Sequence, residues 1–153
     1  MTDGLRSEFA DADDSPGFML WRVSNTWQAA QRAALRPFDL THVQFVLLAS
    51  LTWLRSDVPV TQRDLADHVH TDPMMTSQVL RVLETKGLIR RASHPTDGRA
   101  RALMVTREGA ALANAANAAV EAVDQVFFSQ LGDDLLEFTG LLRHLTAGRQ
   151  SAK

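Results

Sequence analysis

Two helix-start signals that lie close together between residues 61 and 73 constrain the fold of this chain more than any other feature. Thr61-Gln62-Arg63-Asp64 places a hydroxyl acceptor three residues before a carboxylate, which is the pattern of a capped helix start. Asp72-Pro73 places an acceptor at the N-cap and a proline at the first helical position. A short helix must therefore end in a tight turn at His70-Thr71, and a second helix follows.

The second helix is predicted to end at Lys86-Gly87, where glycine suits a left-handed cap. Two strand-like segments come next, 88–92 and 101–105, around a polar loop with its tip at Asp97-Gly98. Val58-Pro59-Val60 is predicted to be an edge strand, because proline cannot donate to a ladder inside a sheet. The order helix, turn, helix, hairpin follows from these signals.

Longer helices are predicted on both sides of this region. Ser15-Pro16 starts one that stops near Arg36, and Thr41 starts another that runs to about Arg55, before a turn at Ser56-Asp57. From residue 107 the chain is helical again, with a break at Gly132-Asp133. Apolar residues follow three- and four-residue steps in the first and last of these regions: Leu20, Val23, Trp27, Ala30, Ala34, and then Leu112, Ala116, Ala119, Val123, Val126.

The predicted fold class is mainly α with a small β-hairpin wing, a winged helix-turn-helix flanked by N- and C-terminal helices. The expected divisions are 1–15 as a flexible N-terminus, 16–57 as N-terminal scaffold helices, 58–106 as the winged helix-turn-helix lobe, 107–147 as C-terminal helices, and 148–153 as a flexible tail.

Composition excludes several functions. The 153 residues contain no cysteine, which excludes disulfides, thiol redox sensing and thiolate metal sites. The net charge of −2 conceals a basic segment. Residues 86–107 hold six cations and one anion, so their net charge is 6 − 1 = +5, and the rest of the chain carries −2 − 5 = −7. Such a local basic stripe suits a face that meets phosphates. The start of the chain lacks a signal-peptide pattern and no apolar run is long enough to span a membrane, so a cytoplasmic location is expected.

The second of the two short helices has the two faces of a DNA-reading helix. Thr76, Leu80 and Leu83 share the predicted inward face. Arginine pairs with guanine, glutamine with adenine, and serine with phosphate or either base. We therefore expect base contacts from the side chains on the opposite, outward face, and we expect Met75 to pack inward. The outward face holds Met74, Ser77, Gln78 and Arg81.

Three segments carry a family resemblance. Lys86-Gly87-Leu88-Ile89, then Asp97-Gly98-Arg99, then Thr106-Arg107-Glu108-Gly109 resemble the MarR family of regulators, whose pattern there is K-G-L-[IV], a wing D-x-R and a strand ending T-x-x-G. The resemblance extends over roughly residues 16–147. It implies a winged-helix homodimer with two recognition helices in successive major grooves of DNA. Residues 16–57 and 107–147 would form the dimerisation region, and residues 58–106 the DNA-binding lobe.

The resemblance also implies roles for single residues. Arg99 matches the family's wing arginine, which enters the minor groove, and Asp97 would brace the wing by pairing with a nearby guanidinium such as Arg101. Two departures are Gly98, where many relatives carry a second basic residue, and Gln78, where relatives often have arginine. Members of the family commonly hold a small aromatic or anionic effector, for which the candidate contacts are Trp27, His42, Phe45 and Trp53.

Two alternatives remain open from the sequence. His68 and His70, with Asp72 and His94, offer donors for a metal-binding protein, but the spacing crosses a helix end and lacks the H-E-x-x-H pattern. A winged-helix protein-interaction module that has lost DNA binding is the other. No phosphate loop, dinucleotide fingerprint or G-x-S-x-G is present, so no catalytic residue, cofactor or metal is expected.

The sequence therefore predicts a transcriptional regulator, a ligand-responsive homodimeric repressor that binds a pseudo-palindromic operator. Ser77, Gln78 and Arg81 would read bases and Arg99 the minor groove. The residues expected to position the DNA backbone are Thr61, Gln62, Arg63, Thr71 and Arg101.

Overall fold

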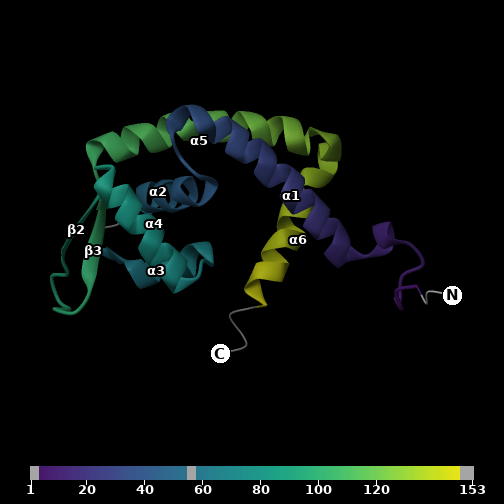
Figure 1. Ribbon diagram of the computed structural model, residues 1–153, viewed down its shortest axis with the longest axis horizontal. Coiled ribbons are helices and arrows are strands. Elements are labelled where there is room, and N and C mark those ends of the chain that lie inside the picture. The colour runs from purple at the N-terminus through teal and green to yellow at the C-terminus, as the bar shows by residue number, and fades with distance from the viewer. Residues whose placement is uncertain (1–3, 55–57, 149–153) are drawn as a thin grey trace. The chain divides into compact units, whose positions relative to one another are not determined.

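Capped helices build the N-terminal part of the computed structural model, which describes residues 4–54 and 58–148 (Figure 1). After a short 3-10 turn, η1 (Ala12–Asp14), helix α1 (Pro16–Leu35) starts at Ser15, whose hydroxyl accepts the Phe18 N–H at 3.3 Å. A second turn, η2 (Arg36–Phe38), leads to α2 (His42–Trp53). The predicted capping box at Thr41 and Gln44 is confirmed. The predicted turn at Ser56-Asp57 and the helix end at Arg55 lie outside the described residues.

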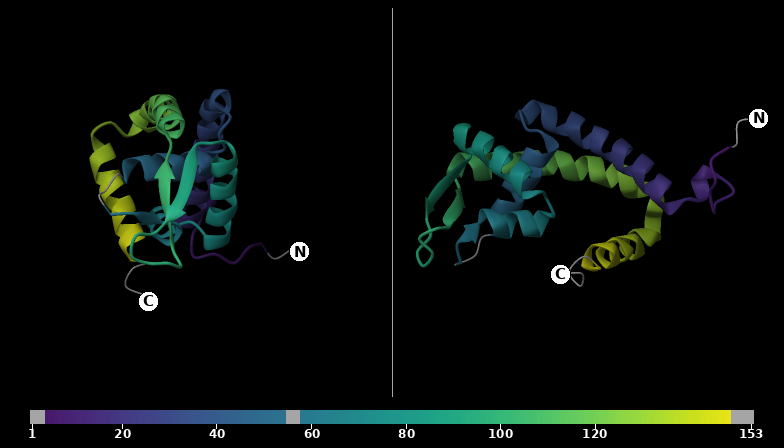
Figure 2. Two further views of the ribbon diagram at one scale, coloured as in Figure 1. Left: turned by 90° about the vertical axis from the view of Figure 1, so that its left-hand side faces the viewer. Right: turned by 60° about the horizontal axis from the view of Figure 1, so that its bottom comes forward.

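The helix-turn-helix and hairpin follow in the predicted order. Helix α3 (Gln62–Val69) has its capping box at Thr61 and Asp64, and α4 (Pro73–Thr85) has its N-cap at Asp72. The turn between them passes through His70 in the left-handed conformation, and Gly87 after α4 is also left-handed, with φ of 73°. Strands β2 (Ile89–Ser93) and β3 (Arg101–Val105) form the hairpin, which projects from one end of this region (Figures 1 and 2).

The edge strand was predicted in the right place but to begin two residues too early. Strand β1 consists of Val60–Thr61, paired antiparallel to Leu103 and Ala102, and the sheet order is β1-β3-β2. Pairing begins only after Pro59, because proline has no N–H to donate. The edge position is confirmed, whereas Val58 and Pro59 are not part of the strand.

The chain divides into two compact units, residues 1–120 and 121–153. Helix α5 (Arg107–Phe128) begins in the first unit and ends in the second. The second unit continues through η3 (Ser129–Asp134), where Gly132 has φ of 51° and breaks the helix as predicted, and α6 (Leu135–Ala147). Within the described residues, no helix is both long enough and apolar enough to cross a bilayer.

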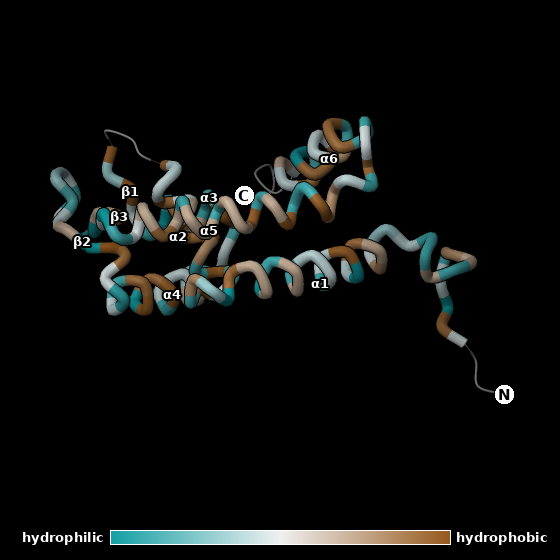
Figure 3. Tube along the Cα trace, turned by 90° about the horizontal axis from the view of Figure 1, so that it is seen from above, coloured by the Kyte–Doolittle hydropathy of each residue, from teal (hydrophilic) through white to brown (hydrophobic). Residues whose placement is uncertain are grey.

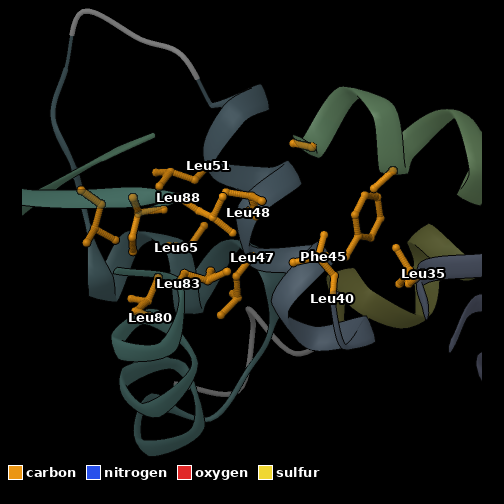
Figure 4. Packing of buried hydrophobic residues seen from close by; sticks show 14 of the residues in the cluster. Leu35, Leu40, Phe45, Leu47, Leu48, Leu51, Leu65, Leu80, Leu83 and Leu88 are labelled. Carbon is orange, nitrogen blue, oxygen red and sulfur yellow. The ribbon is translucent and has the colours of Figure 1, made fainter. Parts of the chain in front are cut away.

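Leucines from several helices make the core of the first unit (Figure 4). Leu47 and Leu48 of α2 are fully buried and meet leucines of α3 and α4. Burying one leucine stabilises a fold by roughly 1.5–3 kcal/mol, so this cluster holds the helix-turn-helix to its scaffold. The fully buried partners on α3 and α4 are Leu65, Leu80 and Leu83.

Candidate DNA-binding surface

The start of α4 is fixed by a short chain of hydrogen bonds. The Asp72 carboxylate accepts the Met75 N–H at 2.9 Å. The buried Thr76 hydroxyl donates to the Asp72 carbonyl at 2.8 Å and lies 2.8 Å from the Thr71 hydroxyl. Because the Thr76 proton is used by Asp72, Thr71 is the donor in the second contact. Thr71, which we expected at the DNA backbone, therefore uses its hydroxyl proton to hold the turn between the two helices.

The remaining side chains of α4 lie as the helical pattern predicts, with one exception. Gln78 and Arg81 are exposed, Ser77 is half-buried and Met74 is 71% exposed. Met75 is 48% exposed, so the prediction that it packs inward was wrong. Its position in the first turn leaves it beyond the core leucines of α4. The outward face thus offers a guanidinium, an amide, a hydroxyl and two thioethers.

The three residues predicted at the start of α3 differ in their exposure and in their contacts with neighbouring side chains. Arg63 is 88% exposed and lies 4.0 Å from the Asp67 carboxylate, and Gln62 is half-buried. Thr61 is held by Asp64: its N–H donates at 2.9 Å and its hydroxyl at 2.8 Å to the same carboxylate oxygen. These two bonds, the backbone bond first, lower the pKa of the Asp64 carboxyl. Thr61 therefore serves first as the cap of α3.

The wing loop is closed by hydrogen bonds within itself. Asp97 accepts the Arg99 N–H at 3.0 Å, and in the part of the chain that the structure describes it makes no ion pair within 4.0 Å. The expected pairing of Asp97 with Arg101 is thus replaced by a local turn, because the carboxylate is nearer to the backbone two residues on. His94 adds to the closure: its Nδ1 accepts the N–H groups of Thr96 at 3.2 Å and Asp97 at 3.1 Å.

The sequence reasoning missed this role of His94 and treated it only as a metal donor. The available signal was its position two and three residues before backbone donors of a tight loop. Closure of the loop leaves Arg99 and Arg101 exposed on the wing.

Ion pairs divide the cations of the basic segment into two groups. Arg91 on β2 is 22% exposed and its Nε lies 3.2 Å from Glu84 of α4, while Lys86 lies 3.3 Å from Asp39. The Arg91 Nε has no aligned hydrogen bond to Glu84, so this contact is an ion pair only. These two cations hold elements together. Across residues 4–54 and 58–148, no carboxylate lies within 4.0 Å of Arg81, Arg99 or Arg101, which leaves their charges available to phosphates.

The four candidate effector contacts do not converge. The rings of Trp27 and His42 meet edge to face, with centroids 5.1 Å apart. Phe45 is 6% exposed and belongs to the core. Trp53 is 85% exposed at the far end of α2, about 16 Å along the helix from His42. Of the four, the structure therefore brings Trp27 and His42 together.

The described residues give no support to the metal-binding alternative. Of the residues that the structure describes, no three His, Cys, Asp or Glu side chains come together in a group able to hold a metal ion. His68 lies in the last turn of α3, whereas His70 caps the helix in the left-handed conformation. Their side chains therefore leave the backbone in different directions.

A helix-turn-helix with an exposed polar second helix, followed directly by a cationic β-hairpin, defines a winged helix-turn-helix protein. The family model described as MarR family matches residues 40–100. An uncharacterized HTH-type transcriptional regulator of Bacillus subtilis, YdcH, is 44% identical over 124 residues, which cover 80% of this chain and 84% of that protein. The HTH-type transcriptional repressor Rv2887 of Mycobacterium tuberculosis is 35% identical over 121 residues, 78% of this chain and 85% of that protein.

Solved structures agree with these relatives. CouR from Rhodococcus jostii, bound to p-coumaroyl-CoA, superposes with a TM-score of 0.80 at 27% identity and covers 90% of this chain and 96% of its own. Rv2887 in complex with salicylic acid gives a TM-score of 0.67 at 34% identity, covering 88% and 99%. Rv2887 in complex with DNA gives 0.65 at 31% identity, covering 86% and 97%. The chain belongs to the MarR family, and it is a transcriptional regulator rather than an enzyme.

Proposed function

We propose that this regulator is a homodimeric, ligand-responsive repressor of the cytoplasm that binds a pseudo-palindromic operator through α4 and the wing. The observation that carries the proposal is the outward face of α4, where Gln78 and Arg81 are exposed beside a wing that presents Arg99. Arginine and glutamine make two-pronged contacts to guanine and adenine in the major groove. A wing arginine suits the negative potential of a narrow minor groove.

Exposed apolar side chains on the terminal helices support the dimer. Trp21 and Leu20 of α1 are 67% and 55% exposed, and Leu136 and Leu145 of α6 are 80% and 71% exposed. Figure 3 shows hydrophobic residues recurring along α1 and along α6. Exposed apolar residues at this density mark an interaction surface, and a second copy with two-fold symmetry would cover both helices. Two recognition helices would then lie about 34 Å apart, one turn of B-DNA.

The apolar row predicted on α5 also supports a dimer. This α5 stripe consists of Leu112, Ala116, Ala119, Val123 and Val126. The buried residues of α5 include Ala113 and Val120, which face the first unit's core. Of the stripe predicted from the sequence, Ala116 is buried in the single chain, and Val126 is 75% exposed. The exposed part of the stripe is available to a partner helix.

The Trp27 and His42 pair supports an effector with an aromatic ring and an anionic group. An aromatic edge beside an imidazole offers stacking and a partner for a carboxylate. Salicylic acid, found with the relative Rv2887, has this chemistry, and the relative CouR was solved with p-coumaroyl-CoA, which also contains an aromatic ring and anionic groups. Effector binding would stabilise a dimer whose recognition helices no longer match the groove spacing.

Selection from a random duplex pool, followed by binding measurements across salt concentrations, tests the proposal. We expect an enriched two-fold symmetric sequence, with affinity that falls steeply as salt rises. Arg81→Ala should cost about 1–3 kcal/mol and relax preference at one base pair, whereas Arg99→Ala should weaken binding more evenly across sequences.

Two results would count against the proposal. Equal losses on all operator variants for Arg81→Ala would contradict base reading by that residue. No enriched duplex at all, together with affinity that ignores salt, would favour the protein-interaction module instead.

A further inference from the structure

Lys86, the residue that caps the C-terminal end of α4, has its ammonium group surrounded by oxygens from a distant part of the chain. Its Nζ lies 2.5 Å from the Asp39 carbonyl oxygen, 3.3 Å from the Asp39 carboxylate and 3.4 Å from Gln44 Oε1. An ammonium group has three N–H donors, so the three contacts can use all of them. Its side chain is 30% exposed, whereas the side chain of a lysine without such contacts is mostly exposed to water.

The oxygen atoms that Lys86 contacts are held in place by the structure of the α1–α2 corner itself. Asp39 has φ of 52° and ψ of 41°, a left-handed conformation that ends η2 and turns its carbonyl toward α4. Gln44 Oε1 also accepts the Thr41 N–H at 3.2 Å as part of the capping box of α2. The corner between α1 and α2 therefore offers a rigid oxygen cluster, and the cation joins the end of α4 to it.

The other side of the same turn is fixed to the start of α5. The Thr106 hydroxyl donates to the Gly87 carbonyl at 2.8 Å and lies 3.1 Å from the Leu88 carbonyl. The segment Lys86-Gly87-Leu88 is thus held by the α1–α2 corner on one side and by the β3–α5 junction on the other. A change in the angle of α4 relative to α1 and α2 must break the Lys86 contacts.

The corner also adjoins the candidate effector contacts. His42 opens α2 and lies two residues before Gln44, and its ring meets Trp27 of α1. Displacement of the α2 start by a molecule held against these rings would displace the Gln44 acceptor. The end of the recognition helix would follow through Lys86.

We infer that Lys86 is a positioning residue that sets the angle of the recognition helix by binding the α1–α2 corner, and so fixes the half-site spacing that the dimer accepts. This inference rests on the proposed DNA-binding function. Lys86 does not need to touch DNA for this role. Its effect appears in spacing selectivity, which a simple loss of stability would not change.

The first test compares operator spacing preferences for the wild type and Lys86→Met, using duplexes with the selected half-sites separated by the best spacer and by one or two base pairs more or fewer. For the wild type, a one-base-pair change should lower affinity by about tenfold or more, because it misplaces the base contacts of one half-site. For Lys86→Met we expect a preference of about threefold or less. Lys153→Met removes the other lysine of the chain and is the charge-matched control, with an unchanged spacing profile.

A second test needs no DNA. In Lys153→Met the single remaining lysine gives a single side-chain ammonium signal in ¹H–¹⁵N spectra. We expect that signal to persist at neutral pH, where a freely hydrated ammonium exchanges too fast to be seen. Gln44→Glu keeps the capping box and places a carboxylate beside Lys86, so exchange should become slower still.

These outcomes distinguish a failure of the proposed DNA-binding function from a failure of the positioning role of Lys86. A wild type that binds no duplex would refute the proposed function, and the ammonium spectra would still decide whether the link exists. A folded Lys86→Met with the wild-type spacing preference would overturn the positioning role. The contacts between Lys86 and the α1–α2 corner would be refuted if the ammonium signal were absent, as it is for free lysine. They would also be refuted if Gln44→Glu left the exchange rate of that signal unchanged.

Discussion

Gly109 allows helix α5 to touch the turn that ends the recognition helix, and its replacement by alanine tests that contact. A Cβ atom at Gly109 would lie 2.0 Å from the Leu88 carbonyl oxygen and 3.0 Å from a methyl group of Val105. The clashing atom belongs to the backbone, so no rotamer change relieves it. Separation to 3.0 Å requires α5 and the turn to move apart by 3.0 − 2.0 = 1.0 Å.

The cost follows from three contributions. Overpacking against a fixed neighbour costs about 1–3 kcal/mol. The movement also stretches the hydrogen bond from the Thr106 N–H to the Leu88 carbonyl, now 3.0 Å, which is worth about 0.5–1.5 kcal/mol. Alanine returns at most about 1 kcal/mol through its helix propensity. We therefore expect Gly109→Ala to lower the free energy of unfolding by about 2–3 kcal/mol.

Urea denaturation followed by circular dichroism, at one fixed protein concentration, measures this loss. With a slope of about 2 kcal/mol per molar urea, the midpoint should fall by about 1 M. Gly17→Ala is the matched control, because Gly17 also lies in a first helical turn but the nearest atom to its Cβ is 4.0 Å away. It should stabilise by about 0.4–1 kcal/mol. A Gly109→Ala protein as stable as the wild type would refute the close approach of α5 to Leu88.

Three further predictions concern the cap of α3, the buried core and the terminal helices. Because the pKa of Asp64 is lowered in the folded state, its carboxylate stabilises the fold above the unfolded pKa of about 3.9, and this contribution is lost as pH falls through the folded pKa. Asp64→Asn should therefore lower the melting temperature at pH 7 but much less at pH 3; an equal difference at both would contradict the capping role. Leu80→Ala, at a fully buried site, should cost about 2–5 kcal/mol. Leu136→Ala, at a site 80% exposed in the single chain, should instead weaken dimerisation in sedimentation measurements, and unchanged self-association would contradict that role for α6.

Local signals predicted most of the fold. The caps at Ser15, Thr41, Thr61 and Asp72 all act where the sequence placed them, because each depends on a side chain and a backbone donor within three residues. The start of β1 was wrong because strand pairing depends on which residues of β3 lie opposite, and that is set by the tertiary fold.

The site was harder to predict wherever long-range contacts decide the outcome. The exposure of Gln78 and Arg81 follows from helical periodicity, and the structure agrees. The sequence could not show that Lys86 and Arg91 are held by Asp39 and Glu84, because the Lys86 partner is 47 residues away. Their inclusion in the basic stripe therefore overstated the charge available to DNA. The separation of Trp53 from His42 was predictable, because both lie on one helix and are about 16 Å apart along it, whereas the contact between Trp27 and His42 depends on how α1 packs on α2.

Amide chemical-shift mapping with the selected operator duplex tests whether α4 and the wing form the DNA-binding surface. We expect the largest shifts on the outward face of α4 around Gln78 and Arg81 and on the wing around Arg99, with two chains bound per duplex. Shifts confined to α1 or α6, with the α4 and wing amides unchanged at saturating duplex, would contradict this role of α4 and the wing.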